Sequence, residues 1–207
     1  MYDLSIDYEQ SIFFGKDRYY TPDDFIDDIF FNIYNHDDVG GRNKVGEGHI
    51  RILDFCKYAN YPYDLDFDFS DIIDSDRQIF NLFEVISSPK FIFNRYYNSD
   101  LYKSFFLKKF DCGLLYDKVA YLEKLQIFKE HQGLNIGSMV LQQLQDRFYV
   151  DYIAVIPFPL EFNKKSKEDY NPEDFDLKMK KVINFYKKNG YKQIAKSKFY
   201  MLTYNQE

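Results

Sequence analysis

Alternating apolar and polar positions predict β-strands in the N-terminal third of the chain. In the segment "DIFFNIYN" the side chains of Ile29, Phe31 and Ile33 fall on one face, as in a strand with one buried side. The turn-rich residues 36 to 48 are expected to form a loop. On this basis the sequence predicts three extended segments, at residues 2 to 8, 28 to 35 and 48 to 55.

Two segments in the middle of the chain have a helical pattern. Each opens with a Ser-Asp pair. Serine and aspartate are favoured at helix N-termini because their side chains accept hydrogen bonds from free backbone N–H groups. We therefore expect helices over residues 75 to 87 and 99 to 110.

A long extended segment is predicted at residues 113 to 128, with Glu123, Leu125 and Ile127 on one face. A glycine-containing turn follows it. Beyond the turn, apolar residues recur at fourfold spacing, which predicts a helix that packs on a sheet. The residues that carry this helical pattern are Ile136, Val140 and Leu144, with Met139 beside them.

The C-terminal third continues the alternation of strands and helices. Residues 151 to 158 are almost continuously apolar, as expected for a strand covered on both faces. The next segment has Asn171 as a predicted N-cap, Pro172 at the first helical position and Gly190 as the stop. Two final strands are expected at residues 191 to 195 and 198 to 204. This order predicts a βαβ core with one parallel pair of strands.

Length and composition favour a single domain. The 207 residues are 45% hydrophobic, which is enough for a buried core, and no repeat or long linker divides them. The first twenty residues carry several acids and no continuous apolar core, and no apolar run is long enough to cross a membrane. The two cysteines, Cys56 and Cys112, form no metal-binding motif. We expect a cytoplasmic protein with no metal.

The charge of the chain is unevenly distributed. Residues 1 to 100 carry 9 Lys and Arg against 20 Asp and Glu, whereas the remainder carries 18 against 13. Either both parts are solvated surfaces, or the basic part meets an anionic cofactor and the acidic part meets a cationic substrate. The overall net charge of −6 disfavours binding to nucleic acid, which requires a concentrated basic surface.

Several motif-like segments are better explained as structure. The segment "GRNKVGEG" has the spacing of a P-loop, but Glu47 stands where a phosphate-binding lysine is required, so a hairpin loop is expected. An aspartate-rich segment from Asp64 lacks the glycine and final glutamate of a calcium loop. No Ser/His/Asp signature accompanies the histidines, although a cluster in space stays open: they are His36, His49 and His131.

The segment "KEHQGLNIGSMVLQQL", residues 129 to 144, combines a strand-to-helix turn with small residues. Backbone N–H groups at such a turn, together with the positive end of a helix, bind a pyrophosphate without help from side chains. Asn135 is among the residue types that adopt positive φ most readily after glycine. The alternative is a simple glycine turn, and the segment alone does not separate the two.

The surrounding sequence resembles the GNAT superfamily of N-acetyltransferases. Residues 122 to 141, "LEKLQIFKEHQGLNIGSMVL", are similar to its acetyl-CoA-binding segment, in which Gln132 and Gly137 match the motif and Asn135 replaces the central glycine. Downstream, "INFYKKNGYK" resembles the helix end "FYEKLGF" of that family. The likeness covers roughly residues 119 to 204. The segments "SDIIDSD" and "IPFPLEF" also resemble an uncharacterised bacterial branch with an N-terminal extension.

The resemblance implies an α/β fold with a mixed, mostly antiparallel twisted sheet, a splayed parallel strand pair and flanking helices. One domain is expected over residues 1 to 207, with a strand-rich part at 1 to 75 and an acetyl-CoA-binding core at 112 to 204. Backbone groups near Ile127 and Lys129 would pair with the pantetheine arm. The residues from Gln132 onward would hold the pyrophosphate: Gln132, Gly133, Leu134, Asn135, Ile136, Gly137 and Ser138.

The same resemblance implies acetyl transfer from acetyl-CoA to a primary amine by direct attack. Tyr186 would give a proton to the departing thiolate, and Glu123 would accept the amine's proton through water. Both residues have a structural explanation as well. Tyr186 shares an apolar helix face with Val182 and Ile183 and is equally suited to a core position, while Glu123 suits a strand edge.

Two departures from the family pattern favour a second hypothesis. Asn135 replaces a glycine, and Met179 and Val182 stand where the family often has Asn and Ala. A domain of this kind that binds CoA without catalysis, or binds another protein, is the alternative to the enzyme. A purely structural protein would instead fill the predicted cleft with apolar side chains.

Overall fold

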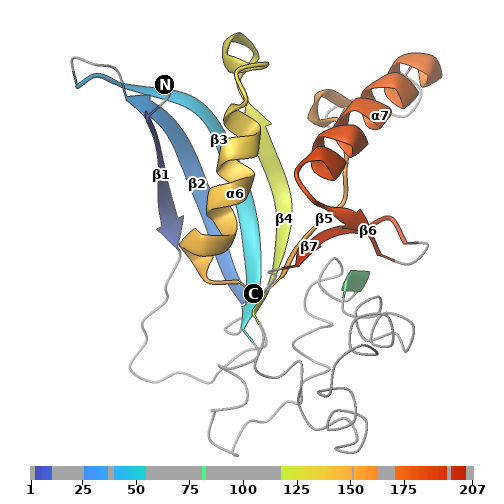
Figure 1. The fold of residues 1–207 in the computed structure, drawn as a ribbon, viewed down its shortest axis with the longest axis horizontal. Coiled ribbons are helices and arrows are strands. Elements are labelled where there is room, and N and C mark those ends of the chain that lie inside the picture. Colours follow the sequence, from blue (N-terminus) through green and yellow to red (C-terminus); the bar gives the residue numbers. More distant parts are fainter. Residues whose placement is uncertain are drawn as a thin grey trace, which may run out of the picture.

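The structure, a computed structural model, describes a mixed sheet with few helices (Figure 1). It describes residues 3 to 10, 26 to 36, 40 to 54, 81 and 82, 118 to 150, 152 to 162, 171 to 194 and 197 to 203. The seven strands pair in the order β1-β2-β3-β4-β5-β7-β6. They are β1 (Asp3–Gln10), β2 (Ile26–His36), β3 (Arg42–Asp54), β4 (Lys118–Ile127), β5 (Tyr152–Val155), β6 (Lys192–Gln193) and β7 (Tyr200–Thr203).

Two α-helices and two 3-10 turns complete the described elements. Helix α6 lies across the sheet formed by the N-terminal strands, and α7 lies to its side, toward β5 and β6 (Figure 1). Predicted helices at residues 75 to 87 and 99 to 110 fall outside the described residues, except that residues 81 and 82 are helical. The elements are η3 (Lys129–His131), α6 (Ile136–Phe148), η4 (Leu160–Phe162) and α7 (Pro172–Lys188).

The predicted alternation in β2 is confirmed. Ile29, Phe31 and Ile33 are buried, whereas Phe30 between them is 56% exposed. Strands β1, β2 and β3 form antiparallel pairs, so the N-terminal segment joins the same sheet as the C-terminal strands. The fold class is therefore α/β, with a sheet that is mostly antiparallel.

Strand β3 begins earlier than the sequence predicts. Residues 36 to 48 were expected to be a loop, but the strand starts at Arg42. A Cβ atom added at Gly48 would lie 2.1 Å from the Phe31 ring, and one added at Gly46 would lie 2.5 Å from the carbonyl oxygen of Gln126. These glycines are required for close contact between neighbouring strands rather than for a turn.

Strand β4 contains a bulge that overturns one prediction. Ile50 of β3 lies opposite Leu122, but His49 lies opposite Lys124, so Glu123 is an extra residue on β4. An extra residue reverses the alternation of side chains beyond it. Glu123 therefore does not share a face with Leu125 and Ile127: these two pack against the core, whereas Glu123 contacts His49.

The predicted βαβ unit is confirmed. Strand β5 pairs in parallel with β4, and α6 connects them. All four residues of β5 are buried, as expected for a strand covered on both faces. The predicted core face of α6 is correct, because Ile136, Val140 and Leu144 are each at most 1% exposed.

Helix α7 begins and ends at the residues that the sequence predicts. The Asn171 side chain accepts hydrogen bonds from the backbone N–H groups of Glu173 and Asp174, and Pro172 occupies the first turn. Gly190 follows the helix with φ 86°, a conformation that glycine adopts without strain. Within the described ranges, no helix has the length and apolar character that a membrane span requires.

Candidate functional site

The turn between β4 and α6 places two residues at positive φ. Gly133 has φ 82° and Asn135 has φ 62°. The carbonyl oxygen of Asn135 accepts a hydrogen bond from the Met139 amide at 3.1 Å, which makes Asn135 the N-cap of α6. Asparagine tolerates this conformation better than other non-glycine residues, so Asn135 fits this turn.

The backbone N–H groups of residues 133 to 138 have no hydrogen-bond acceptor among the described residues. Gly133, Leu134 and Asn135 are exposed, and the first turn of α6 contains no acidic residue. Free N–H groups and the partial positive charge of a helix N-terminus together favour an anion. We call residues 133 to 138 the amide cradle.

The side chain of Gln132, an exposed residue, folds back toward the end of β4. Its side-chain Nε2 donates to the carbonyl oxygen of Ile127 at 2.9 Å, and the Phe128 amide donates to the Val45 carbonyl at 3.0 Å. These contacts attach the turn to the end of β4 and to β3. Gln132 thus fixes the shape of the turn that carries the amide cradle.

Three elements meet at Gly137. A Cβ atom there would lie 3.0 Å from the ring of Phe185 on α7 and 3.6 Å from Cγ1 of Ile127 on β4. The first turn of α6 thus passes so close to α7 that a larger residue at this position requires the Phe185 ring to shift. Gly137 therefore has a structural reason of its own, besides the proximity to a ligand that the sequence predicts.

The parallel pairing of β4 and β5 is short. Residues 119 to 122 of β4 pair with residues 152 to 155 of β5, and the pairing ends at Leu122 and Val155. Residues 124 to 127 continue to pair with β3, but no described strand pairs with their other edge. The backbone groups on that edge lead directly from the bulge at Glu123 to the amide cradle.

Tyr186 lies in the core near the end of α7. It is 6% exposed, and its ring makes edge-on contacts with Phe185 and Tyr191, with ring centroids 5.3 Å apart in each pair. Burial raises the pKa of the Tyr186 hydroxyl well above its ordinary value, and the nearby Tyr121 adds to the increase. The hydroxyl stays protonated at neutral pH, which is compatible with a proton donor and equally with a core tyrosine.

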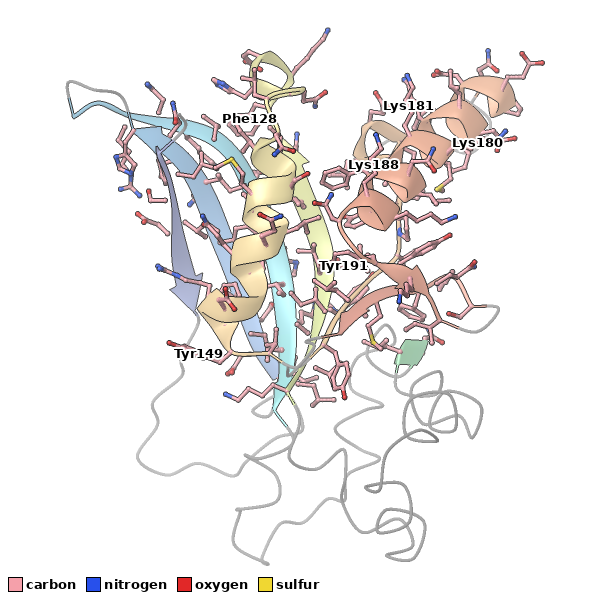
Figure 2. All side chains as sticks on the ribbon, viewed as in Figure 1. Phe128, Tyr149, Lys180, Lys181, Lys188 and Tyr191 are labelled. Atoms are coloured by element: carbon pink, nitrogen blue, oxygen red, sulfur yellow. The ribbon has the colours of Figure 1, made fainter. Side chains whose placement is uncertain are left out.

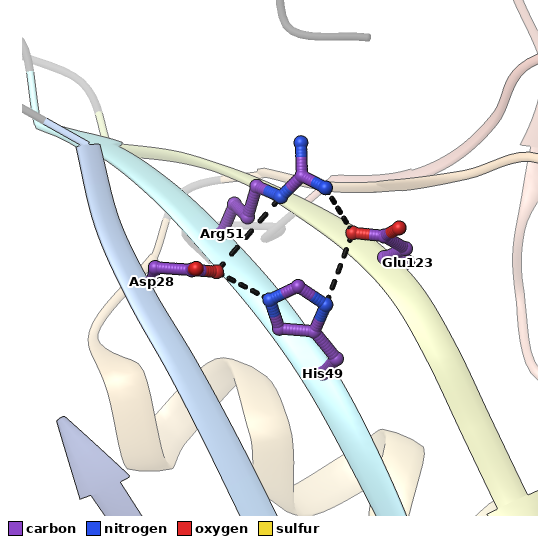
Figure 3. A network of polar contacts seen from close by, with 4 residues as sticks. All are labelled: Asp28, His49, Arg51 and Glu123. Atoms are coloured by element: carbon purple, nitrogen blue, oxygen red, sulfur yellow. Dashed lines mark hydrogen bonds and ion pairs between the residues drawn. The ribbon is translucent and has the colours of Figure 1, made fainter. Parts of the chain in front are cut away.

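Four polar side chains form a network at the β4 bulge, on the face opposite α6 (Figure 3). His49 contacts Asp28 through Nε2 and lies 3.0 Å from Glu123 Oε2 through Nδ1. Arg51 forms an ion pair with the same Glu123 oxygen, and its Nε is 3.9 Å from Asp28. The Glu123 carboxylate therefore contacts both His49 and Arg51. We call Asp28, His49, Arg51 and Glu123 the bulge network.

Sequence reasoning found Glu123 but missed its partners. A signal was present: His49 and Arg51 alternate with Ile50 and Ile52, which are buried, so both point to the opposite face. Asp28 lies directly across from Arg51 in the strand pairing. That register depends on the β2–β3 hairpin, whose strand boundary the sequence misplaced.

A pocket of about 360 Å³ opens beside the bulge network. The ring of Phe30 stacks on His49 with centroids 4.1 Å apart and an angle of 5° between the planes. Leu160, which follows β5, forms another part of the wall. The pocket is lined by Phe30, Phe31, Asn32, Glu47, Gly48, His49, Glu123, Lys124 and Leu160.

The acidic residues of the pocket wall are paired. Glu47 contacts Lys44 at 2.8 Å and Lys124 at 2.6 Å. These hydrogen bonds, chiefly the one from Lys124, lower the pKa of the Glu47 carboxyl from 4.5 to about 2. Glu123 forms an ion pair with Arg51. At the pocket, the negative charge of the N-terminal half of the chain is therefore balanced by neighbouring basic side chains.

The predicted site residues lie in three places. Ile127, Lys129 and residues 132 to 138 gather around the end of β4 and the start of α6. Glu123 lies at the bulge, and Tyr186 lies on α7 beside Phe185, which contacts the cradle. Helix α7 also carries exposed basic side chains, including Lys180, Lys181 and Lys188 (Figure 2).

No family model matches the chain, and no curated protein matches it.

Proposed function

We propose that the protein transfers an acetyl group from acetyl-CoA to a primary amine by direct attack, as a member of the GNAT superfamily with a splayed β4–β5 pair. The observation that carries this proposal is the amide cradle. Its backbone N–H groups at residues 133 to 138 have no acceptor among the described residues, and a pyrophosphate supplies acceptors of suitable charge.

The unpaired edge of β4 supports the same proposal. It connects the cradle to Glu123 at the bulge, because the pairing with β5 ends at Leu122. The pantetheine arm of CoA contains two amides, and an extended amide chain pairs with an open strand edge through backbone hydrogen bonds. In this arrangement the thioester lies near the bulge and the pyrophosphate lies at the helix.

The assigned chemistry uses few side chains. The neutral amine attacks the thioester carbonyl, and Tyr186 gives a proton to the departing thiolate. Burial raises the pKa of Tyr186, so the hydroxyl carries its proton at neutral pH. Glu123 lines the pocket in which the amine is expected to bind, and it receives the amine's proton through water in the simplest version of this mechanism.

The pocket favours an amine that is recognised by hydrogen bonds. Glu47 and Glu123 are paired with basic side chains, so their charge is largely neutralised. Asn32 offers an amide, and Phe30 offers an exposed apolar ring. A small acceptor with polar groups and an apolar part fits this lining, and a cationic acceptor gains less from it than the net charge of the N-terminal half suggests.

A second candidate function is CoA binding without catalysis. The burial of Tyr186 favours it, since the side chain packs among core residues as a structural tyrosine would. Such a module retains the cradle but requires no acid on α7. Amine-dependent turnover that requires the Tyr186 hydroxyl distinguishes the enzyme from this module.

The experiment that tests the proposal combines acetyl-CoA with an amine panel of ethanolamine, glucosamine, spermidine and lysine amide. Release of free thiol measures acetyl transfer, and calorimetry measures acetyl-CoA binding. Thiol release that depends on an amine supports the enzyme. Binding with no release across the panel supports the module, and absence of binding contradicts both.

A further inference from the structure

Two polar side chains that line the pocket have hydrogen-bonding atoms without a partner among the described residues. Glu123 uses its Oε2 for both Arg51 and His49, and its Oε1 contacts neither. The Asn32 side chain makes no hydrogen bond within the described part of the chain. By contrast, both oxygens of Glu47 are occupied, Oε1 by Lys124 and Oε2 by Lys44. Glu123 Oε1 and the Asn32 amide are therefore available to a ligand in the pocket.

The Phe30 ring provides an apolar surface in the same pocket. It stacks on His49 with an angle of 5° between the planes, and His49 is held in turn by Asp28 and Glu123. The plane of the Phe30 ring is thus fixed, with one face covered by the imidazole. Because Phe30 is 56% exposed, the rest of the ring is open. Leu160 adds a second apolar group, and such a lining favours a ligand with an apolar ring.

The strand register places the carboxylate, the ring and the amide in order across the pocket. His49 lies opposite Phe30 on β2 and opposite Lys124 on β4. Glu123 is the bulge residue next to Lys124, on the side of Arg51 (Figure 3). On the other side, Asn32 lies two residues further along β2, a distance of about 7 Å. A ligand that uses all three groups therefore has a polar group at each end and a ring between them.

We propose that the acceptor is a hydroxyphenyl-alkylamine, with its primary amine at Glu123 Oε1, its ring against Phe30 and its ring hydroxyl at the Asn32 amide. The inference rests on the proposed acetyl transfer and specifies the amine substrate of that reaction. One imidazole separates the Phe30 ring from the Glu123 carboxylate, so a short alkyl chain joins the ring of the acceptor to its amine. Phe30 and Asn32 determine the specificity.

Other classes of amine use this lining less well. A simple alkylamine leaves the Phe30 ring exposed and the Asn32 amide without a partner. A polyamine brings a further positive charge close to Lys124, and the nearest carboxylate, Glu47, is already paired. An aromatic ring gains from contact with Phe30 beyond the area that it buries. A hydroxyl both donates and accepts, so it can bond to either end of the Asn32 amide.

The reaction on this acceptor balances with the groups already assigned. The neutral amine forms a C–N bond to the thioester carbonyl carbon, and the C–S bond breaks with its electron pair on sulfur. The sulfur takes the Tyr186 proton and leaves as the CoA thiol. The new amide nitrogen releases one proton through water toward Glu123 and on to the solvent, from which the Tyr186 hydroxyl is restored. The ring hydroxyl at Asn32 does not react.

The test compares kcat/KM at saturating acetyl-CoA for ethylamine, phenethylamine and tyramine, which share one aminoethyl chain. For the wild type we expect phenethylamine to exceed ethylamine by at least about tenfold, the scale of an added apolar group in a pocket. Tyramine should exceed phenethylamine by about fivefold, the scale of one neutral hydrogen bond. A wild type that acetylates ethylamine as efficiently as both aromatic amines overturns the inference and leaves acetyl transfer supported.

Three variants assign the two preferences to their residues. Phe30→Ala should lower the ratio of phenethylamine to ethylamine about tenfold, and Asn32→Ala should remove the advantage of tyramine over phenethylamine. Tyr149→Ala removes another exposed aromatic side chain, directly after α6 and outside the pocket, and should change neither ratio. An equal loss for all three amines in Asn32→Ala would show a structural role and contradict the assignment. Should Phe30→Ala fail to fold, Phe30→Leu takes its place, with a smaller fall in the same ratio expected.

Calorimetry of tyramine binding in the presence of CoA separates this inference from the proposed function. Binding to the wild type that is about fivefold weaker in Asn32→Ala supports the aromatic-amine site, even where no amine is acetylated. In that case acetyl transfer is wrong and the ligand class stands. Absence of both tyramine binding and acetylation contradicts the two together.

Discussion

The carbonyl oxygen of Asn135 accepts a hydrogen bond from the Met139 amide at 3.1 Å, although Asn135 has φ 62°. The residue that starts α6 is thus in the left-handed region, and the N–H groups around it are left without described acceptors. Asparagine adopts this conformation more readily than other non-glycine residues, so Asn135 is compatible with the turn.

Replacement of Asn135 by glycine should leave acetyl-CoA affinity unchanged or slightly higher, because glycine adopts positive φ at no steric cost. Asn135→Val should weaken binding and destabilise the fold by about 1 to 2 kcal/mol, since a β-branched residue is strained at this φ. Calorimetry and urea unfolding measure the two effects. A large loss of affinity in Asn135→Gly would mean that the side chain itself contacts the ligand.

Gly137→Val should lower both stability and acetyl-CoA affinity, because a Cβ atom at this position would lie 3.0 Å from the Phe185 ring. The double variant Gly137→Val with Phe185→Ala relieves that contact. We expect it to recover affinity relative to Gly137→Val alone, measured by calorimetry. Affinity that stays low after the ring is removed would show that the added methyl groups obstruct the ligand directly.

Tyr186→Phe should depress kcat by about 10²-fold or more while acetyl-CoA affinity changes little, because only the proton donor is removed. Since the pKa of Tyr186 is raised by burial, the wild type should show no alkaline decline from loss of this acid up to pH 10. Steady-state kinetics across pH measure both properties. Equal turnover in wild type and variant would remove Tyr186 from the mechanism and leave it a core residue.

Glu47→Gln should destabilise the fold at pH 7 by about 1 kcal/mol, the scale of a partly exposed ion pair. The folded-state pKa of Glu47 lies at about 2, below its ordinary 4.5, so the stabilisation is complete above pH 4.5 and is lost as pH falls toward 2. Urea unfolding of both proteins at pH 7 and pH 3 measures the difference. A difference that does not shrink at pH 3 would contradict this account.

Much of the fold follows from the sequence, because local signals agree with it. The fourfold apolar spacing of α6, the Asn171 cap of α7 and the continuous apolar run of β5 each depend on a few adjacent residues. The early start of β3 does not follow from the sequence, because glycines such as Gly46 and Gly48 are typical of turns. What explains them is contact with Phe31 and Gln126 on neighbouring strands.

The candidate site likewise has one part that the sequence predicts and one part that it does not. The cradle is a continuous segment, so its positive φ residue and its exposed amides were predictable from the turn itself. The bulge network was not, because Asp28, His49 and Glu123 come from three strands and meet through a strand register that contains a bulge. The extra residue at Glu123 has no signature in sequence, and it alone decides which face the carboxylate occupies.

Binding of acetyl-CoA to the amide cradle is the central claim, and Ser138 allows the most direct test of it. Ser138→Pro removes one backbone N–H in the first turn of α6, which has no intrahelical acceptor, and Ser138→Ala retains that N–H as the matched control. A hydrogen bond to a charged group contributes about 1.5 to 3 kcal/mol, so calorimetry should show about a tenfold to hundredfold weaker affinity for acetyl-CoA in Ser138→Pro and little change in Ser138→Ala. Equal affinity in both variants, or no binding to the wild type, would contradict the claim.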